Sequence, residues 1–227
     1  MRRRDMCRFI IIKSQNEIHP EDILHRFAAM ARRSRSPDGD RQSDGWGISW
    51  LSNDMKWQVY KSINPIWDES HTFSSFSKSR FIVAHARSAF SKNDNKVLDH
   101  NQPFCRGAYA FVFNGLLRGV SFSFPIAGDI GSQKIWTLLQ DQLGRFSPKD
   151  ALLRLKKMLE KNCREIEGLN IGLCDGINIY AYCRYSMHPE YYNLRFHESS
   201  TLKIISSEAL DGYDFVPVEI GQILTSY

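Results

Sequence analysis

The first half of the chain is built from short apolar runs separated by polar turns. The run at residues 7–13 is typical of a buried strand. Pro20, Glu21 and Asp22 then predict the start of a helix, because proline suits the first turn and early carboxylates complement the helix dipole. Further apolar runs predict a hairpin and two more buried strands, at residues 45–50 with 57–60, at 81–86 and at 109–113.

The second half predicts two helices followed by more strands. Ser132 can cap the first of these helices, and Ser147 followed by Pro148 predicts the start of the second. Four strand-like runs follow, at residues 170–174, 178–183, 202–206 and 222–225. Strands, then helices, then strands favour an α+β fold with segregated layers. Because no Pro- or Ser-rich linker divides the chain, we expect one domain over residues 7–227.

The composition excludes several classes of protein. The chain has 227 residues, of which 42% are hydrophobic, and this is enough to bury a sizeable core and to exclude wholesale disorder. Its apolar runs are too short for a transmembrane helix or a secretory signal. Five cysteines without short paired spacings argue against a disulfide framework and a zinc finger. We therefore expect a cytoplasmic protein with reduced thiols, no membrane contact and no metal ion.

Two basic clusters, at residues 2–4 and 32–35, contribute much of the formal net charge of +5. Such clusters occur in nucleic-acid binders, but here the other charges are mixed in sign and no zinc finger, RNP-type strand or basic heptad accompanies them. A solvated helix end and loop explain the second cluster better, so we expect no nucleic-acid partner. The sequence also lacks a glycine-rich phosphate loop, and no cofactor is expected.

Five short segments place glycine or polar residues at the ends of predicted strands. Taken singly, each has an ordinary structural explanation, because Asp-Gly and Asn-Gly are turn signals and a cysteine that starts a strand most often belongs to a core. Their order along the chain is more informative. The segments are Met6-Cys7-Arg8-Phe9, Asp44-Gly45-Trp46-Gly47, His85-Ala86-Arg87-Ser88, Asn101-Gln102-Pro103-Phe104 and Phe113-Asn114-Gly115.

In this order the segments resemble the class II glutamine amidotransferases, which belong to the N-terminal-nucleophile hydrolases. The resemblance runs from Met6 almost to the C-terminus, where residues 206–210 are similar to a Ser-Glu-Pro-Leu segment of the family. The most similar branch is the stand-alone bacterial type, which includes the γ-glutamyl hydrolase of ergothioneine synthesis. The resemblance implies a four-layer αββα sandwich, in which two mostly antiparallel sheets are covered by helices.

The resemblance also implies roles for single residues. Cys7 matches the nucleophile, which must be the first residue of the mature chain because its own α-amino group serves as general base. Asn114 and the main-chain N–H of Gly115 match an oxyanion hole. Arg87 matches the residue that grips the substrate α-carboxylate, for which a planar, permanently charged guanidinium is well suited. The other implied pocket residues are Asp44, Gly45, Trp46, Gly47, Asn101, Gln102, Pro103 and Phe104, of which Trp46 is also explained as a core aromatic.

Residues 1–6 depart from the family, because with them Cys7 would carry a peptide N–H and no free amine. Translation from Met6 followed by removal of that methionine would free the amine, and so would cleavage of a propeptide. Retention would give an inactive precursor or a degenerate enzyme. We favour the start at Met6, because Met6 directly precedes Cys7, and expect the leader to be absent from the mature protein.

A second departure lies at residues 131–133. The family has an acid on each side of a Ser or Thr here, and its Asp receives the substrate α-ammonium, whereas this chain has Gly131 and Gln133. An unpaired ammonium in a closed pocket is costly. We therefore expect a substrate without a free α-amine or with a different head group, unless Asp129 replaces the lost contact. Drift at a site that no longer binds glutamine would explain the same change.

The implied activity is hydrolysis of the γ-amide of glutamine or a related γ-glutamyl compound, through a γ-glutamyl thioester on Cys7. The expected partners are a small γ-glutamyl substrate and either a separate synthase that accepts the ammonia or, for a plain hydrolase, none. The alternative is a catalytically silent family member that acts as a binding or regulatory partner. Reaction of Cys7 with a glutamine-like electrophile distinguishes the two.

Overall fold

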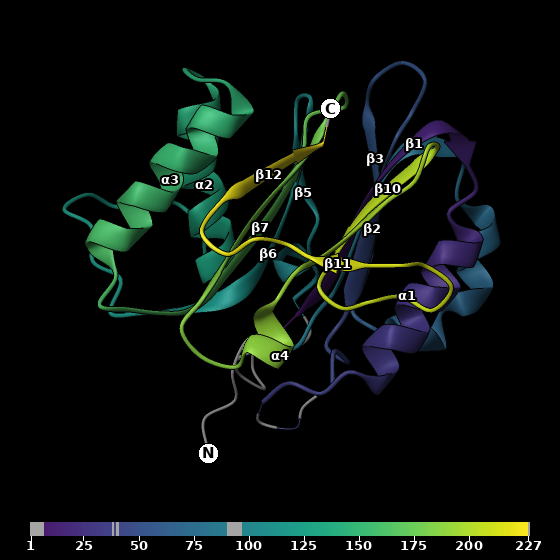
Figure 1. The fold of residues 1–227 in the computed structure, drawn as a ribbon, viewed down its shortest axis with the longest axis horizontal. Coiled ribbons are helices and arrows are strands. Elements are labelled where there is room, and N and C mark those ends of the chain that lie inside the picture. The colour runs from purple at the N-terminus through teal and green to yellow at the C-terminus, as the bar shows by residue number, and fades with distance from the viewer. Residues whose placement is uncertain (1–6, 38, 40, 90–96, 227) are drawn as a thin grey trace.

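The computed structural model describes residues 7–37, 39, 41–89 and 97–226, so the expected leader lies outside the described residues. Two antiparallel sheets form its centre (Figure 1). The seven-stranded sheet has the order β11 (Val216–Pro217), β9 (Arg195–Glu198), β10 (Leu202–Ser206), β1 (Arg8–Ile18), β4 (Ser79–Ala86), β2 (Trp46–Leu51) and β3 (Trp57–Ser62). The five-stranded sheet has the order β12 (Ile223–Ser226), β8 (Ile179–Tyr185), β7 (Glu165–Cys174), β6 (Tyr109–Arg118) and β5 (Phe104–Arg106).

Helices cover the outer face of each sheet. In Figure 1 the layers follow one another as helices, sheet, sheet and helix, which confirms the expected αββα arrangement. α1 (Glu21–Arg33) lies on the seven-stranded sheet, and α2 (Gly131–Leu143) with α3 (Pro148–Asn162) lies on the five-stranded sheet. Shorter helical turns complete the chain, namely η1 (Ile66–Asp68), η2 (Ser70–Ser75), η3 (Leu98–His100) and α4 (Pro189–Tyr192).

β1 is buried on both faces, which explains why its sequence is an unbroken apolar run rather than an alternating one. Ile10 and Ile12 pack toward α1 and contribute to the core on that side of the sheet. Phe9 and Ile11 point the other way, into the core between the two sheets, where they meet residues such as Val112 of β6. The strand that follows Cys7 is therefore held from both sides.

The sequence predicted the start of α3 correctly but not the capping residue of α2. Ser147 caps α3 as expected, since its side-chain oxygen accepts a hydrogen bond from the main-chain N–H of Asp150 at 3.2 Å. Ser132 does not cap α2, because the helix already begins at Gly131. The side chain of Gln133 reaches back instead, and its Oε1 accepts from the main-chain N–H of Asp129 at 2.7 Å.

Three short strands, β5, β9 and β11, were not expected, because segments of this length carry little periodic signal. Among the described residues no helix is both long and apolar enough to cross a membrane.

Candidate active site

The neighbouring strands β1 and β4 place Cys7 and Arg87 side by side at the same end of the seven-stranded sheet's central strands. The antiparallel register places Arg8 of β1 opposite Ala86 of β4, and Ala86 opposite Trp46 of β2. Cys7 directly precedes Arg8, and Arg87 directly follows Ala86, so the two residues adjoin although they are distant in sequence. Both lie in the wall of one cavity.

Asn114 reaches Cys7 from β6 of the other sheet. The main-chain N–H of Cys7 donates a hydrogen bond to Oδ1 of Asn114 at 3.0 Å. This donor fixes the orientation of the side-chain amide, so that Nδ2 is left as the available group. Nδ2 is buried and has no hydrogen-bond partner among the described residues. A buried donor without a partner is costly to keep, and its place beside the thiol suits an oxygen that gains negative charge.

The main-chain N–H of Gly115 points toward the same cavity. Successive N–H groups of a strand alternate between its two edges. Phe113 donates its N–H to Oε1 of Gln102 at 2.6 Å, on the edge of β6 that faces away from β7. The N–H of Gly115, two residues later, therefore faces this edge as well, where Asn114 and Gly115 line the cavity.

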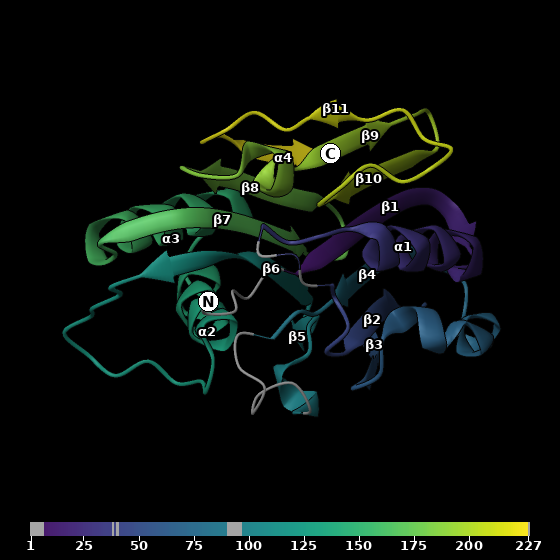
Figure 2. The same cartoon turned by 90° about the horizontal axis from the view of Figure 1, so that it is seen from below.

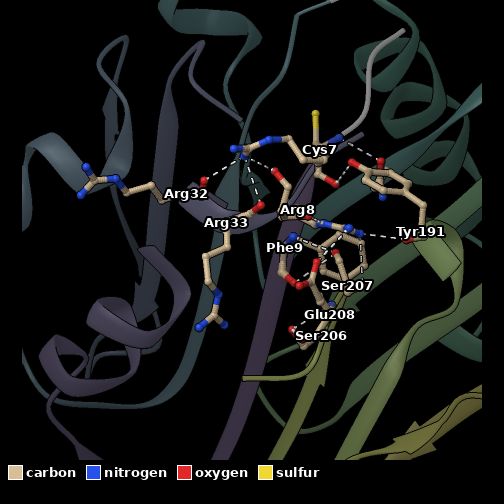
Figure 3. Close-up of polar contacts among 12 residues, drawn as sticks. Cys7, Arg8, Phe9, Arg32, Arg33, Tyr191, Ser206, Ser207 and Glu208 are labelled. Atoms are coloured by element: carbon tan, nitrogen blue, oxygen red, sulfur yellow. Dashed lines mark hydrogen bonds and ion pairs between the residues drawn. The ribbon is translucent and has the colours of Figure 1, made fainter. Parts of the chain in front are cut away.

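Arg8 anchors the strand that carries Cys7 (Figure 3). Its Nη2 forms an ion pair with Oε2 of Glu208 at 2.9 Å, and its Nε donates to the hydroxyl of Ser34 at 2.7 Å. Its Nη1 donates to the main-chain oxygens of Tyr191 at 2.8 Å and of Ser207 at 3.2 Å. Arg8 is only 2% exposed, so this network pairs a buried charge with an opposite charge and with three further acceptors.

Asp44 and Gly45 hold the chain on the far side of Arg87. The main-chain N–H of Arg87 donates to the oxygen of Gly45 at 2.8 Å, and Oδ2 of Asp44 accepts from the N–H of Ala89 at 2.8 Å. Gly45 has a φ of +116°. A Cβ there would lie 2.3 Å from Nδ2 of Asn101, which itself donates to the oxygen of Ser62 at 2.7 Å. Only glycine fits here, because the backbone conformation disfavours other residues and no space is left for a Cβ.

Gln102 supports β6 near Asn114. Besides accepting from Phe113, it donates its Nε2 to the oxygen of the same residue at 3.1 Å. Gly47 lies against it, because a Cβ at Gly47 would come within 2.5 Å of the main-chain oxygen of Gln102. Gln102 and Gly47 thus support the part of β6 that carries Asn114 and Gly115, and Gln102 also lines the cavity.

The cavity has a volume of about 610 Å³. The sequence-predicted residues that line it are Cys7, Arg87, Gln102, Asn114 and Gly115. Those that do not are Asp44, Gly45, Trp46, Gly47, Asn101, Pro103, Phe104 and Asp129. His100 also lines the cavity. Arg118, Lys134 and Arg164 line it too and were not predicted as binding residues, because single basic residues carry no motif that marks them.

Three of the expected pocket residues lie elsewhere for clear reasons. Trp46 is fully buried in the core under α1 and donates its Nε1 to Oε2 of Glu69 at 2.8 Å. Phe104 packs against Phe111 in the core beneath α2. Asp129 is exposed. Trp46, Phe104 and Asp129 are therefore not among the residues that line the cavity.

His85 contributes no base to the site. It is fully buried, and burial together with the nearby charge of Arg87 lowers its pKa to about 3, so the imidazole stays neutral at physiological pH. Burial raises the pKa of Cys105 and of Cys183 to about 11, and it raises the pKa of Cys163 and Cys174 as well. The described part of the chain holds no group of three or more potential metal-ligating side chains.

Comparisons with known proteins identify the family and the fold of the chain. Residues 6–203 match the family described as glutamine amidotransferases class-II. A class-II domain protein from Silicibacter pomeroyi is 16% identical with a TM-score of 0.65, over 96% of this chain and 94% of that one. The glutamine phosphoribosylpyrophosphate amidotransferase from B. subtilis is 16% identical with a TM-score of 0.69, over 96% of this chain and 47% of that one. A search of curated proteins gives no match.

Proposed function

The chain belongs to the class II glutamine amidotransferases, and we propose that it hydrolyses the γ-amide of glutamine or a related γ-glutamyl compound through a thioester on Cys7. The observation that carries this proposal is the contact between Cys7 and Asn114. The side-chain oxygen of Asn114 accepts a hydrogen bond from the nitrogen of Cys7, and its Nδ2, which has no partner among the described residues, is available to donate to an oxyanion.

The reaction needs the nitrogen of Cys7 as a free amine. An α-amine has a reference pKa of about 8, so it can take the thiol proton near neutral pH. Sγ then attacks the γ-carbonyl carbon, the C–N bond breaks, and the proton passes to the departing nitrogen to give ammonia. Water next adds to the thioester, the C–S bond breaks, and the products are a γ-carboxylate and the restored thiol.

We further propose that Arg87 binds the α-carboxylate of the substrate. It lies in the cavity wall with Cys7 and is only 3% exposed. A charge-assisted hydrogen bond in such a place is about twice as strong as a neutral one. Asn114 and Gly115 would hold the oxyanion at the opposite end of the same ligand.

The test is stoichiometric labelling of Cys7 by a glutamine-like diazoketone, followed by peptide mass spectrometry. It uses protein that begins at Cys7, checked by intact mass, with Cys7→Ala as the matched control. The raised pKa of the other four thiols keeps them protonated, so labelling should be confined to Cys7. Protein that retains residues 1–6 yet releases ammonia would contradict the amine-base mechanism.

A second candidate function is that of a catalytically silent family member that acts as a binding or regulatory partner. The absence of any Asp or Glu among the described cavity-lining residues favours it, because nothing there pairs with the α-ammonium of glutamine. This candidate predicts no labelling and no ammonia release from protein with a free Cys7 amine. If ammonia is released, its passage to a separate synthase is the partner relationship that we propose.

A further inference from the structure

We propose that the cavity selects N-acylated γ-glutamyl amides with an apolar acyl group over free glutamine. This inference rests on the proposed function, because it takes Cys7 as the nucleophile. It follows from three observations, which are the charge of the cavity wall, the vacancy beside Gly131 and the apolar end of the cavity.

The described wall of the cavity carries cations and no anion. Arg87, Arg118, Lys134 and Arg164 line it, and no Asp or Glu does. The charge of Arg118 is balanced by Oε2 of Glu167, 3.1 Å from its Nη2. Lys134 and Arg164 form no ion pair with another described residue. A bound ammonium would therefore lose its hydration among like charges, and this is unfavourable.

Gly131 leaves space for a carboxylate without supplying one. It lines the cavity as the first residue of α2, and a Cβ built on it would meet no atom within 4 Å. An Asp in the first turn of a helix would even be favourable, because it faces the positive end of the helix dipole. The lack of an anion here is thus not imposed by packing.

The cavity continues into an apolar region beyond the reacting end. The loop at residues 119–130 reaches out from the end of β6 and returns to α2, as Figure 2 shows. Val120 and Phe122 of this loop line the cavity together with Leu138 of α2 and Leu159 of α3. Val120 is 47% exposed, so part of this apolar surface faces solvent when no ligand is bound.

An N-acyl group on the substrate would suit both the cationic wall and the apolar region of the cavity. Acylation turns the α-ammonium into a neutral amide, which removes the repulsion from the cationic wall. The acyl chain would then cover the apolar region and be buried against it. The volume of about 610 Å³ lies in the middle of the range of roughly 300–1,000 Å³ that drug-sized ligands occupy, and an acylated amino acid fills such a space better than glutamine does.

The first test compares glutamine with N-acetyl-, N-butanoyl-, N-hexanoyl- and N-octanoylglutamine as substrates of protein that begins at Cys7. We expect kcat/KM to rise with chain length, by up to about fourfold for each methylene that becomes buried. Free glutamine as good as or better than every acylated form would overturn the inference. The same series is measured as equilibrium binding to Cys7→Ala, so that the selectivity of the cavity is read without turnover.

The second test restores the missing charge. Gly131→Asp should raise kcat/KM for free glutamine at least tenfold and lower it for N-octanoylglutamine, whereas Gly131→Asn, of nearly the same shape but uncharged, should do neither. An unchanged preference in Gly131→Asp would show that the cavity wall does not set the selectivity at the α-amine.

The third test concerns the apolar region. Val120→Asp should abolish the dependence of kcat/KM on acyl chain length. Val216→Asp is the matched control, because Val216 is also exposed, at 60%, and lies on β11, away from the cavity. A chain-length dependence that survives Val120→Asp would contradict the proposed place of the acyl group.

The two proposals fail in distinguishable ways. If no amide is hydrolysed and Cys7 is not labelled, the proposed function is wrong, and the binding series on Cys7→Ala still decides the ligand class. If amides are hydrolysed but glutamine is preferred, the function stands and the inference is wrong.

Discussion

The hydroxyl of Tyr191 donates a hydrogen bond to the main-chain oxygen of Cys7, at 3.2 Å, while the guanidinium of Arg8 lies 3.8 Å above the centre of the same ring (Figure 3). Burial raises the pKa of Tyr191, so its hydroxyl stays protonated and remains a donor. Cys7 therefore has its oxygen held by Tyr191 and its nitrogen held by Asn114. Both main-chain polar groups of Cys7 are thus held in place at the cavity wall.

Tyr191→Phe should lower kcat several-fold with little change in KM, because the ring and its contact with Arg8 remain while the hydroxyl's hydrogen bonds with Cys7 and Gln42 are lost. The free energy of unfolding should fall by about 1 kcal/mol. Tyr182→Phe is the matched control: Tyr182 is 1% exposed, and its hydroxyl has no partner among the described residues. Steady-state kinetics and chemical denaturation measure both effects. An equal loss of kcat in the two variants would show that Tyr191 has no special part in positioning Cys7.

Asn114→Asp separates the two functions of that side chain. A carboxylate can still accept the hydrogen bond from the nitrogen of Cys7, but it offers no donor to the oxyanion. We expect kcat to fall by about 10²–10³, the usual cost of one oxyanion-hole donor, while binding of the substrate to the Cys7→Ala background changes far less. Single-turnover rates and binding measurements check this. A kcat within threefold of the parent would remove Asn114 from the oxyanion hole.

Arg87→Lys tests the recognition of the α-carboxylate. Lysine keeps the charge and loses the planar fork. The lost charge-assisted hydrogen bonding, about 1.5–3 kcal/mol, corresponds to a fall in kcat/KM of roughly 10- to 100-fold. The internal control is a substrate in which hydrogen replaces the α-carboxylate, since its kcat/KM should be insensitive to the substitution. Equal losses on both substrates would indicate a structural role for Arg87 instead.

Apolar runs predicted the individual strands and helices and an α+β fold, whereas the four-layer arrangement came from the family resemblance. β10 has the expected bounds, and β1 was found from its unbroken apolar run although it extends further, to Ile18. That extension is supported by contacts that no local pattern contains. Gln15, for instance, donates its main-chain N–H to the oxygen of Thr201 at 2.9 Å. A strand continues as far as neighbouring segments satisfy its main-chain hydrogen bonds, and these neighbours are set by the assembled fold.

At the site, order along the chain identified Cys7, Arg87, Asn114 and Gly115, which all line the cavity. The part played by Tyr191 was not predictable, because it depends on contacts across more than 180 positions, such as its hydrogen bond to Cys7, which spans 184. Trp46 lies in the core, which is one of the two places that the sequence allowed for it. Alternation along β2 turns its side chain away from the face where a Cβ at position 47 would meet Gln102.

His85 gives the last prediction, a dependence of stability on pH. Its pKa is lowered to about 3 in the folded state, against about 6.5 in the unfolded chain. Between these values the unfolded chain binds the additional proton, so the stabilisation is complete above pH 6.5 and is lost as the pH falls toward 3. This residue alone should lower the free energy of unfolding by about 2 kcal/mol between pH 7 and pH 5. Denaturation of the parent and of His85→Gln across this range measures the difference, because glutamine does not titrate. Parallel curves for the two proteins would show that His85 takes up its proton as readily in the folded state as in the unfolded one.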